Sequence, residues 1–599
     1  MRKWIGVAGL IAALTWMVSA CSSPTPSVPT AAPLNPVPQL TSAPAQSTSP
    51  AALKVLRIGV TTYPDIIDPQ KSSVVGEVNV LQLAYEGLVR LDEKGNIQPA
   101  ASDQWQTSPD GKLIKFHIRN GLKRSDGSPL ACADFEYALK REVDPYTTGR
   151  LYTSLVLDIK GAQALIDYAD KTEPDKLDKQ QVDALYANYG VSCVDSQTLQ
   201  VELVSPIGFW EYIASTWVTF PTDRRSVEKD PNTWWTKAEN HIGNGPFRIV
   251  QIEEGKRIIL EANPNYWGGR PKIDRIEFIY NTDNQVLFEG YKKGELDLIA
   301  VLPEWLAEIQ NTPTLQASFV RYPAAEVTSF AFNNTRKPFD DKNVRVAFSE
   351  LLDRAGYSND VNKGTTTPYT RWIPPGVPGA QPDKPGVPDT DFAAALKTLV
   401  ENGYAAPDST PDKPKVDCFK LGDLKLTYPA RPVEHARASY IANNIQRVLG
   451  CPVTLDPVDA TVYSDLIKDV KTNPQISRQG WLEDYPHPQN WLTIYWVCGS
   501  FSKRYGYCNP QLDQMLHDAD QTLDFEQAIQ KYKAAEDLLL SDVPGAMAYY
   551  GQNMFLIAPY VLGPKEHTSS EDGIWLGSYG PITQYDIDLT KVPANYPKR

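Results

Sequence analysis

The sequence lacks the signatures of the common enzyme classes. It contains no G-x-S-x-G, no H-E-x-x-H and no Walker-type loop, and Gly255-Lys256 lacks the Ser or Thr that would complete such a loop. Its six histidines are scattered without metal-ligand spacing, and no C-x-x-C pair suggests a zinc site. We therefore expect no catalytic residue, no cofactor and no metal site.

Basic surfaces and long apolar runs are also scarce. The formal net charge is −13 and no basic face is evident, which argues against nucleic acid as a partner. The apolar run at 4–18 is shorter than the ~20 residues that a membrane-spanning helix needs. The composition, 42% hydrophobic and 22% charged, is that of a globular protein, and 599 residues exceed what one core holds. We expect two or three compact units.

The N-terminus carries export signals. Met1-Arg2-Lys3 is a short basic segment before the apolar run, and Val18-Ser19-Ala20-Cys21 resembles the lipobox of bacterial lipoproteins. That resemblance implies a signal peptide over 1–20 and lipidation of Cys21; an ordinary signal peptide cleaved nearby is the alternative. Acyl chains on Cys21 would hold the protein at a membrane surface. Residues 21–52 would then be a tether, because 22–52 carry eight prolines and no charge, and such a segment cannot bury a core.

The remaining six cysteines predict disulfides, because an even number in an exported chain is typical of paired cysteines. Nearness in sequence favours Cys498–Cys508 across a loop and Cys418–Cys451 across a strand–helix–strand unit. The pair Cys132–Cys193 then remains. The first of these three pairings is the best supported.

An unusual segment, 475–491, lies late in the chain. Three aromatic residues bracket the adjacent acids Glu483 and Asp484, and Arg478 lies six residues before Asp484. Prolines at 486 and 488 bias the residues before them to extended conformations, so a helix cannot continue after Asp484. A carboxylate on such a stiffened segment suits a buried cation, because a desolvated charge needs a partner of fixed geometry. The alternative is an aspartate that caps a turn between core aromatics, and Glu483 is expected to be solvated.

Local patterns predict alternating strands and helices. Strand patterns lie at 53–61, 113–119, 198–203, 247–252 and 257–262, and helix patterns at 73–86, 132–141, 344–352, 436–449 and 527–540. The loop 368–388 carries seven prolines, and we expect it to be an exposed surface feature.

Short motifs follow one another in a fixed order along the chain. They are Tyr85-Glu86-Gly87-Leu88, Ser108-Pro109-Asp110-Gly111, Ser125-Asp126-Gly127, Gly243-Asn244-Gly245-Pro246-Phe247, Asn263-Pro264-Asn265-Tyr266-Trp267, Phe332-Asn333-Asn334, and Gly480-Trp481 with Asp484-Tyr485. The ordered set covers nearly the whole chain beyond the tether and resembles the family-5 extracellular solute-binding proteins, the peptide-binding components of bacterial ABC importers. One departure is Ala131, where the family often has a threonine that caps the next helix.

The resemblance implies a fold. It is an α/β, two-lobed periplasmic-binding-protein-like fold of type II, hinged, with an extra α+β domain inserted in lobe I. Lobe I would comprise 53–85, 194–325 and 548–599, the inserted domain 86–193, and lobe II 326–547. Hinge strands would pass near 321–327 and 546–550.

The resemblance also implies a binding site. In peptide-binding members an aspartate in the Gly-Trp-x-x-Asp-Tyr setting binds the ligand's α-ammonium, which gives Asp484 that role. Arg478 lies where some members meet the ligand's carboxylate. A buried zwitterionic peptide needs both partners, because an unpaired buried charge costs several kcal/mol. The other candidates are the backbone of Gly480, Trp481 and Leu482, which could pair with an extended peptide, and the rings of Trp481, Tyr485 and Tyr63 as walls.

We therefore expect a lipid-anchored, monomeric binding component that closes on a peptide and delivers it to ABC permease subunits in the membrane. It would reside in the cell envelope, on the periplasmic or extracellular side. The same fold with another cargo (oligosaccharide, nickel or haem) is the alternative, and 14 tryptophans make sugar stacking conceivable. A different class of protein, a secreted hydrolase or an adhesin, is the further alternative.

Overall fold

The computed structural model describes residues 53–92, 95–563 and 584–597. The predicted signal peptide, the lipidation site Cys21 and the tether lie outside the described residues. Within the described ranges, no helix is both long enough and apolar enough to cross a membrane.

One eleven-stranded mixed sheet runs through the structure. Its strands are β1 (Val55–Val60), β8 (Phe247–Glu253), β9 (Arg257–Ala262), β10 (Arg275–Tyr280), β11 (Leu298–Ala300), β12 (Phe319–Phe332), β13 (Thr366–Pro368), β14 (Leu424–Pro429), β15 (Val453–Val458), β16 (Ile476–Leu482) and β17 (Gly545–Ile557). The order is β15-β14-β16-β12-β17-β11-β1-β10-β9-β8, with β13 paired to β17 off this path. The strands predicted at 53–61, 247–252 and 257–262 are confirmed as β1, β8 and β9.

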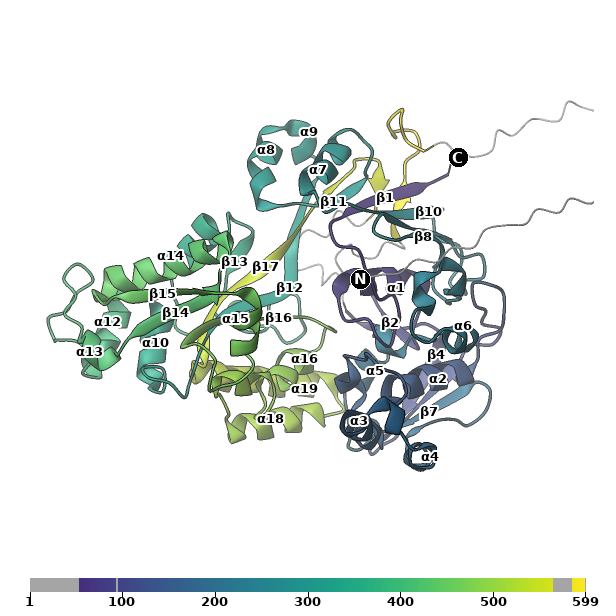
Figure 1. Cartoon of the computed structure of the whole chain (residues 1–599), viewed down its shortest axis with the longest axis horizontal. Helices are drawn as coiled ribbons and strands as arrows, with labels where there is room; N and C mark the ends of the chain where they lie inside the picture. The colour runs from purple at the N-terminus through teal and green to yellow at the C-terminus, as the bar shows by residue number, and fades with distance from the viewer. Residues whose placement is uncertain (1–52, 93–94, 564–583, 598–599) are drawn as a thin grey trace, which may run out of the picture. The chain divides into compact units, whose positions relative to one another are not determined.

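The sheet carries two separate hydrophobic cores, and we call the parts of the chain around them lobe I and lobe II. The lobe I core includes Ile58 and Phe278, and the lobe II core includes Trp372 and Leu539. Both cores draw on β12 and β17, which lie side by side in Figure 1 and contribute apolar residues to lobe I at one end and lobe II at the other. The chain thus has the two-lobed α/β architecture that the resemblance implies.

The pairing of β12 with β17 is irregular between the two cores. The strands are antiparallel, and the register shifts between Pro323 and Val327 and again between Thr328 and Ser329. A register shift bends a strand locally and leaves a residue unpaired. It lies where the sequence predicts a hinge, and the hinge motion itself stays a prediction.

Smaller sheets lie mostly in the stretch predicted as an inserted domain (86–193), and one of their strands, 198–202, falls beyond its predicted end. β2 (Val89–Leu91) pairs with β3 (Ile97–Pro99), and a second sheet has the order β4 (Ser102–Thr107), β5 (Leu113–Ile118), β7 (Thr198–Glu202), β6 (Val191–Cys193). The helices of this stretch are α2 (Cys132–Val143), α3 (Ala162–Lys171) and α4 (Lys179–Tyr186). Helix α2 begins without a hydroxyl cap, and the backbone N–H of Ala131 donates to Asp134 Oδ2 at 2.8 Å instead.

The remaining α-helices are distributed along the rest of the chain. They are α1 (Val75–Ala84), α5 (Trp210–Ile213), α6 (Arg224–Lys229), α7 (Asn284–Lys292), α8 (Leu306–Asn311), α9 (Pro313–Gln316), α10 (Lys342–Glu350), α11 (Arg354–Gly356), α12 (Phe392–Glu401), α13 (Cys418–Leu421), α14 (Pro432–Leu449), α15 (Ala460–Leu466), α16 (Pro488–Trp491), α17 (Thr493–Trp496), α18 (Pro510–Asp520) and α19 (Phe525–Ser541). Asp524 caps α19 by accepting from the backbone N–H of Gln527. Helix α14 ends at Gly450, whose φ of 69° favours glycine.

The family-like motifs of lobe I hold one another in place. Glu86 is buried and accepts hydrogen bonds from the Tyr266 hydroxyl (2.6 Å) and from the Trp267 indole N–H. The Asn244 side chain exchanges two hydrogen bonds with the backbone of Glu86, at 3.0 and 2.8 Å. A Cβ at Gly243 would lie 2.0 Å from the Ala84 carbonyl oxygen, so glycine is required there. These motifs therefore serve packing.

The six cysteines pair as nearness in sequence favours. Cys132–Cys193 joins α2 to β6, Cys418–Cys451 joins α13 to the residue after the α14 cap, and Cys498–Cys508 closes a loop. Each bond cross-links segments that already lie together in the fold.

The proline-rich loop 368–388 is exposed at 382–385 but buried at 371–374, so it is not the wholly exposed feature that its composition predicts. Trp372 is 0% exposed, and the buried Arg371 forms an ion pair with Glu536 of α19 at 2.6 Å. The same carboxylate accepts from the backbone N–H groups of Trp372 and Ile373, at 3.1 and 2.9 Å. The prediction is wrong because a buried carboxylate in a distant helix satisfies the loop's charge and backbone, so its apolar residues can enter the core.

Candidate ligand-binding site

Strand β16 is an interior strand at one end and an edge strand at the other. It pairs with β12 along its whole length, from Ile476 opposite Phe332 to Leu482 opposite Glu326. On its other side, β14 pairs with it only at Ile476. No strand of the described chain covers that side from 478 to 482. A stretch of β-strand edge is therefore open beside the predicted ligand-binding residues.

The open edge presents the backbone of alternate residues. The N–H of Glu483 donates to the Ala325 carbonyl at 3.0 Å, so the backbone N–H and C=O groups of the odd-numbered residues of β16 point towards β12. In an antiparallel pair the backbone groups of the alternate residues point away from the partner strand. On the open part of β16 these residues include Gly480 and Leu482. Their N–H and C=O groups can pair with an added strand, as the sequence predicts. A Cβ at Gly480 would also lie 2.7 Å from the Val327 carbonyl oxygen, so packing alone requires glycine there.

Asp484 follows the end of β16 and is held by one buried amide. The side chain of Asn490, which is 0% exposed in α16, donates to Asp484 Oδ2 at 3.0 Å and accepts from its backbone N–H at 3.1 Å. The same Asn490 oxygen accepts from the Trp481 indole N–H at 3.0 Å. His487 is extended (φ −140°, ψ 139°), as a residue before proline should be, and precedes α16. The aspartate is thus fixed by its own segment.

The Asp484 carboxylate also faces lobe I. It accepts a hydrogen bond from the hydroxyl of Tyr152, whose ring packs edge-on against Trp217 of the lobe I core at 5.1 Å between centroids. Burial raises the pKa of Asp484 to about 6, and the hydrogen bonds from Asn490 and Tyr152 act in the opposite direction. Within the described residues no Lys, Arg or His forms an ion pair with it. It is a half-buried acid whose own structure supplies hydrogen bonds and no counter-charge.

Glu483 is half-buried and not freely solvated, so the expectation of a solvated side chain does not hold. Its Oε2 accepts from the Trp491 indole N–H at 3.2 Å, and burial raises its pKa to about 8, with the neighbouring Asp484 acting in the same direction. The reason is local. Because β16 ends at Leu482, the strand alternation stops there, and both acids turn back onto α16.

The predicted aromatic walls are spread over different parts of the molecule. Tyr485 is 1% exposed and belongs to the lobe I core, which matches the alternative of a core aromatic. Tyr63 lies after β1, and its ring contacts Tyr280 at 4.9 Å; none of the described contacts joins it to 478–485. Trp481 is half-buried in lobe II beside the open edge. Of the three rings, the structure places only Trp481 beside the open edge.

Arg478 lies on the exposed part of β16. Its guanidinium donates to the Tyr549 hydroxyl of β17, from Nε at 3.3 Å and from Nη2 at 3.2 Å. No carboxylate in the described chain lies within ion-pair distance of it. Partial desolvation lowers the pKa of Arg478, but Tyr549, Glu434 and Tyr357 together raise it by more, so the side chain stays charged. The structure therefore brings a cation to one part of the open edge and an acid beyond its other end.

Trp481 is supported from behind by the loop that Cys498–Cys508 closes. Its ring packs edge-on against Phe501 in that loop at 5.1 Å and against Tyr495 at 5.5 Å. The two supporting rings stack on each other at 5.7 Å. The loop therefore sets the position of an aromatic ring next to the open edge.

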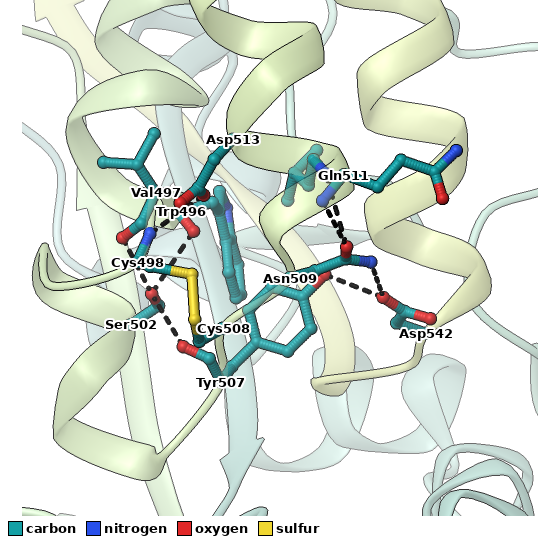
Figure 2. The surroundings of a disulfide bond; sticks show 11 residues. Trp496, Val497, Cys498, Ser502, Tyr507, Cys508, Asn509, Gln511, Asp513 and Asp542 are labelled. Carbon is teal, nitrogen blue, oxygen red and sulfur yellow. Dashed lines mark hydrogen bonds between the residues drawn. A yellow bond between two sulfur atoms is a disulfide. The ribbon is translucent and has the colours of Figure 1, made fainter.

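Figure 2 shows how this loop is fastened. Besides the disulfide, the Ser502 hydroxyl lies within hydrogen-bond distance of the Trp496, Val497 and Tyr507 carbonyls. Asp513 accepts from the Cys498 N–H at 2.9 Å, and Asp542 accepts from Tyr507 and Asn509 at 2.9 and 2.8 Å. The loop is tied to α18 and to the residue after α19.

Three partners escaped the sequence reasoning. Asn490 lies inside the unusual segment, and a buried amide six residues after Asp484 could have been suspected from its place between aromatic residues. Tyr152 and Tyr549 gave no local signal, because each meets its partner only through the tertiary fold.

A family model described as "Bacterial extracellular solute-binding proteins, family 5 Middle" matches residues 96–503. The oligopeptide-binding protein OppA of Bacillus subtilis is 28% identical over 502 residues, which cover 83% of this chain and 87% of that protein. The unliganded open form of MppA, a murein tripeptide binding protein, is similar in structure with a TM-score of 0.72, 25% identity, and coverage of 90% and 98%. Haemophilus influenzae OppA in complex with RPPGFSPFR gives a TM-score of 0.66, 26% identity, and coverage of 89% and 99%.

Proposed function

Because the chain belongs to the bacterial extracellular solute-binding proteins of family 5, we propose that it captures peptides and delivers them to an ABC permease in the membrane. The observation that carries the proposal is the open edge of β16, with Arg478 on it and Asp484 beyond its end. A peptide lying along this edge meets a cation towards one end and an acid towards the other. Its own carboxylate and ammonium are the complementary charges.

The backbone of the open edge contributes affinity for a peptide but no selectivity for its side chains. Gly480 and Leu482 offer backbone donors and acceptors to an extended peptide, and such pairing is blind to the guest sequence. The Asp484 carboxylate adds a charge-assisted hydrogen bond, worth roughly 1.5–3 kcal/mol when water is excluded. The proposed site thus recognises the two ends of a peptide and its backbone.

Closure of the two lobes completes the proposed cycle. Asp484 belongs to lobe II and already reaches Tyr152 beside the lobe I core, so a guest ammonium at Asp484 would contact both lobes. Bending would concentrate where β12 and β17 lose register between Pro323 and Val327. A guest held by both lobes favours the closed form, because only differential contacts shift such an equilibrium.

The setting of the protein in the cell also belongs to the proposal and rests on the sequence. Lipidation at Cys21 after removal of 1–20 anchors the protein at the membrane surface, and 21–52 tether the body to that anchor. The body acts as a monomer, and it binds without chemical conversion of its cargo. The lobe boundaries given from the sequence define the two halves that close.

A thermal-shift series tests the cargo. The full-length chain, purified in detergent, is mixed with Ala-Ala-Ala, N-acetyl-Ala-Ala-Ala, maltotriose, nickel or haem. We expect the free tripeptide to raise the melting temperature, because a ligand that binds the folded state stabilises it. If only maltotriose, nickel or haem raises the melting temperature, that compound and not a peptide is the cargo. Stabilisation by no probe, together with hydrolysis of the tripeptide, would favour the hydrolase alternative.

A further inference from the structure

A pocket opens where β14 and β16 separate. The two strands pair at Leu426 and Ile476, and beyond that point the space between them is bounded by α14 and by Tyr463 of α15. The pocket encloses about 580 Å³, part of it open to solvent, and Arg478 lines it. A peptide on the open edge of β16 therefore meets this pocket at the Arg478 end, because β14 closes the edge there.

Two buried donors in the lining have no partner among the described residues. Tyr357 is 1% exposed and its hydroxyl makes no hydrogen bond, and Nε of Arg437 is likewise buried and unpaired. Burial raises the pKa of Tyr357 while the charges of Arg437 and Arg478 oppose the rise, so its hydroxyl stays a donor with both cations close by. A buried donor without an acceptor costs about 1–3 kcal/mol. The pocket is thus short of an acceptor.

The charges of the lining leave room for one anion. Arg437 donates from Nη1 to Glu434 at 2.6 Å, and this pair is neutral overall. Arg478 adds one positive charge that no described carboxylate balances within ion-pair distance. Glu326 of β12 does not line the pocket, although both arginines act on its pKa. One carboxylate would balance the lining and give Tyr357 and Arg437 an acceptor.

The rest of the lining is mostly apolar and includes three aromatic rings. It includes Phe330, Leu426, Tyr428, Ile441 and Tyr463. Burial of a side chain the size of phenylalanine against such walls is worth about 1.5–3 kcal/mol. A ligand group that carries both a carboxylate and a large apolar side chain would use every part of this pocket.

We propose that this pocket holds the carboxy-terminal residue of the bound peptide and selects a large apolar side chain there. The carboxylate accepts from Tyr357, Arg437 and Arg478, and the side chain lies against the aromatic walls. The inference rests on the proposed function and names the class of peptide: short, with a free carboxyl end on a bulky apolar residue. Asp484 lies six positions after Arg478, about 20 Å along a strand. Once the length of both side chains is subtracted, the remaining span suits a peptide of about three to five residues.

Calorimetric titration of the full-length chain with matched tripeptides tests the selection. Ala-Ala-Phe should bind at least about tenfold more tightly than Ala-Ala-Ala. Ala-Ala-Phe-amide should lose at least about tenfold, because it brings no anion to the pocket. Ala-Ala-Glu-amide carries its carboxylate on the side chain, and binding as tight as that of Ala-Ala-Phe would overturn the assignment to the terminal carboxylate.

Two variants locate the effect in the pocket. Tyr357→Phe removes only the unpaired hydroxyl and should weaken Ala-Ala-Phe about tenfold with little change for its amide. Tyr440→Phe is the matched control: its ring is 5.9 Å from that of Tyr357, but its hydroxyl donates to Asp353 and it does not line the pocket, so affinity should stay within about twofold. Ala438→Leu narrows the pocket, and should cut the preference for Phe over Ala to about threefold or less while Ala-Ala-Ala still binds.

The failures are distinguishable. If no tripeptide binds the unaltered chain, the proposed function fails. If Ala-Ala-Ala and Ala-Ala-Phe bind equally well and Tyr357→Phe changes neither, peptide capture stands and the pocket assignment is overturned. Thermal melting of each variant separates a lost hydrogen bond from a lost fold.

Discussion

The two charged ends of the candidate site are built in opposite ways. Asp484 lies in a turn after a strand, enclosed by Asn490 from its own helix and by Tyr152 beside the other lobe. Arg478 lies on the strand itself, exposed, with the Tyr549 hydroxyl as its partner. The position of Asp484 is thus set by residues from both lobes, whereas the position of Arg478 is set by strands of one sheet.

The difference decides which end is sensitive to its surroundings. A buried acid without a counter-charge has a raised pKa, and an incoming ammonium supplies what is missing. An arginine stays charged at any physiological pH, so its attraction for a carboxylate varies little. We therefore expect the amino end of a peptide to be bound more strongly and more conditionally than its carboxyl end.

Asp484→Asn tests the stronger end. The substitution keeps the size and removes the charge, so a guest ammonium would be buried without a counter-ion. Because breaking a buried pair costs about 3–5 kcal/mol, affinity for Ala-Ala-Ala should fall by a factor on the order of a hundred or more. Calorimetry with N-acetyl-Ala-Ala-Ala is the control, and an equal loss for both peptides would remove Asp484 from this role.

Arg478→Gln tests the other end. The loss should be smaller, about tenfold to thirtyfold, because Arg478 lies on an open edge and water can replace part of its contribution. The loss should appear for peptides with a free carboxylate and be nearly absent for the amide. If amide and free acid weaken alike, Arg478 acts through its contact with Tyr549 rather than through the guest.

The pH dependence of binding separates the two ends further. At pH values below its pKa of about 6, the Asp484 carboxyl group is mostly neutral and cannot form an ion pair with an ammonium. Affinity should therefore rise about tenfold as pH increases from 5 to 7 and level off above that. In Asp484→Asn the same titration should be flat over this range. A pH profile shared by both proteins would assign the titration to another group.

The stability of the unliganded protein should change with pH in the opposite direction. Folding raises the pKa of Asp484 to about 6 and of Glu483 to about 8, above their unfolded values. Their protonated forms thus stabilise the fold below pH ~4, and this contribution is lost as pH rises through the two folded pKa values. Urea unfolding at several pH values measures it. In Glu483→Gln the decline above pH 6 should shrink, and an unchanged decline would contradict the burial of Glu483.

Tyr152→Phe should have the smallest effect. It removes one hydrogen bond to Asp484 from the lobe I side and keeps the ring that packs on Trp217. Affinity for Ala-Ala-Ala should change by about threefold or less, since the ammonium itself binds the carboxylate in the complex. A loss as large as that of Asp484→Asn would mean that Tyr152, and not the guest, sets the geometry of the acidic end.

Local signals account for much of the fold. The hairpin of β8 and β9, helix α14 and the three disulfides follow from patterns within about 60 residues of chain, where apolar period and sequence proximity are informative. The motif around Gly480 and Asp484 pointed to the strand edge and the acid. Much of the family resemblance, by contrast, came from residues such as Glu86 and Asn244, whose role is packing.

The missed features depend on contacts between distant parts of the chain. Nothing near Tyr152 or Tyr549 indicates that one meets Asp484 and the other Arg478. The proline-rich loop enters the core because Glu536 of α19, far away in the sequence, is the partner of Arg371. Glu483 lies just past the end of β16, and its partner Trp491 comes from the following helix α16. Where a charged residue finds its partner is a property of the tertiary fold, and composition does not encode it.

The lobe I core has a consequence for the order of folding. Its first strand donates from the Val55 N–H to the Tyr596 hydroxyl at 2.6 Å, and Arg57 meets Asp297 together with Tyr560. The lobe II core, from Val327 to Tyr549, is continuous in the chain. Lobe II can therefore assemble as soon as its own stretch has emerged, whereas β1 waits for partners that are synthesised more than 500 residues later. A chain shortened at its carboxyl end should keep an intact second half beside an unfinished first.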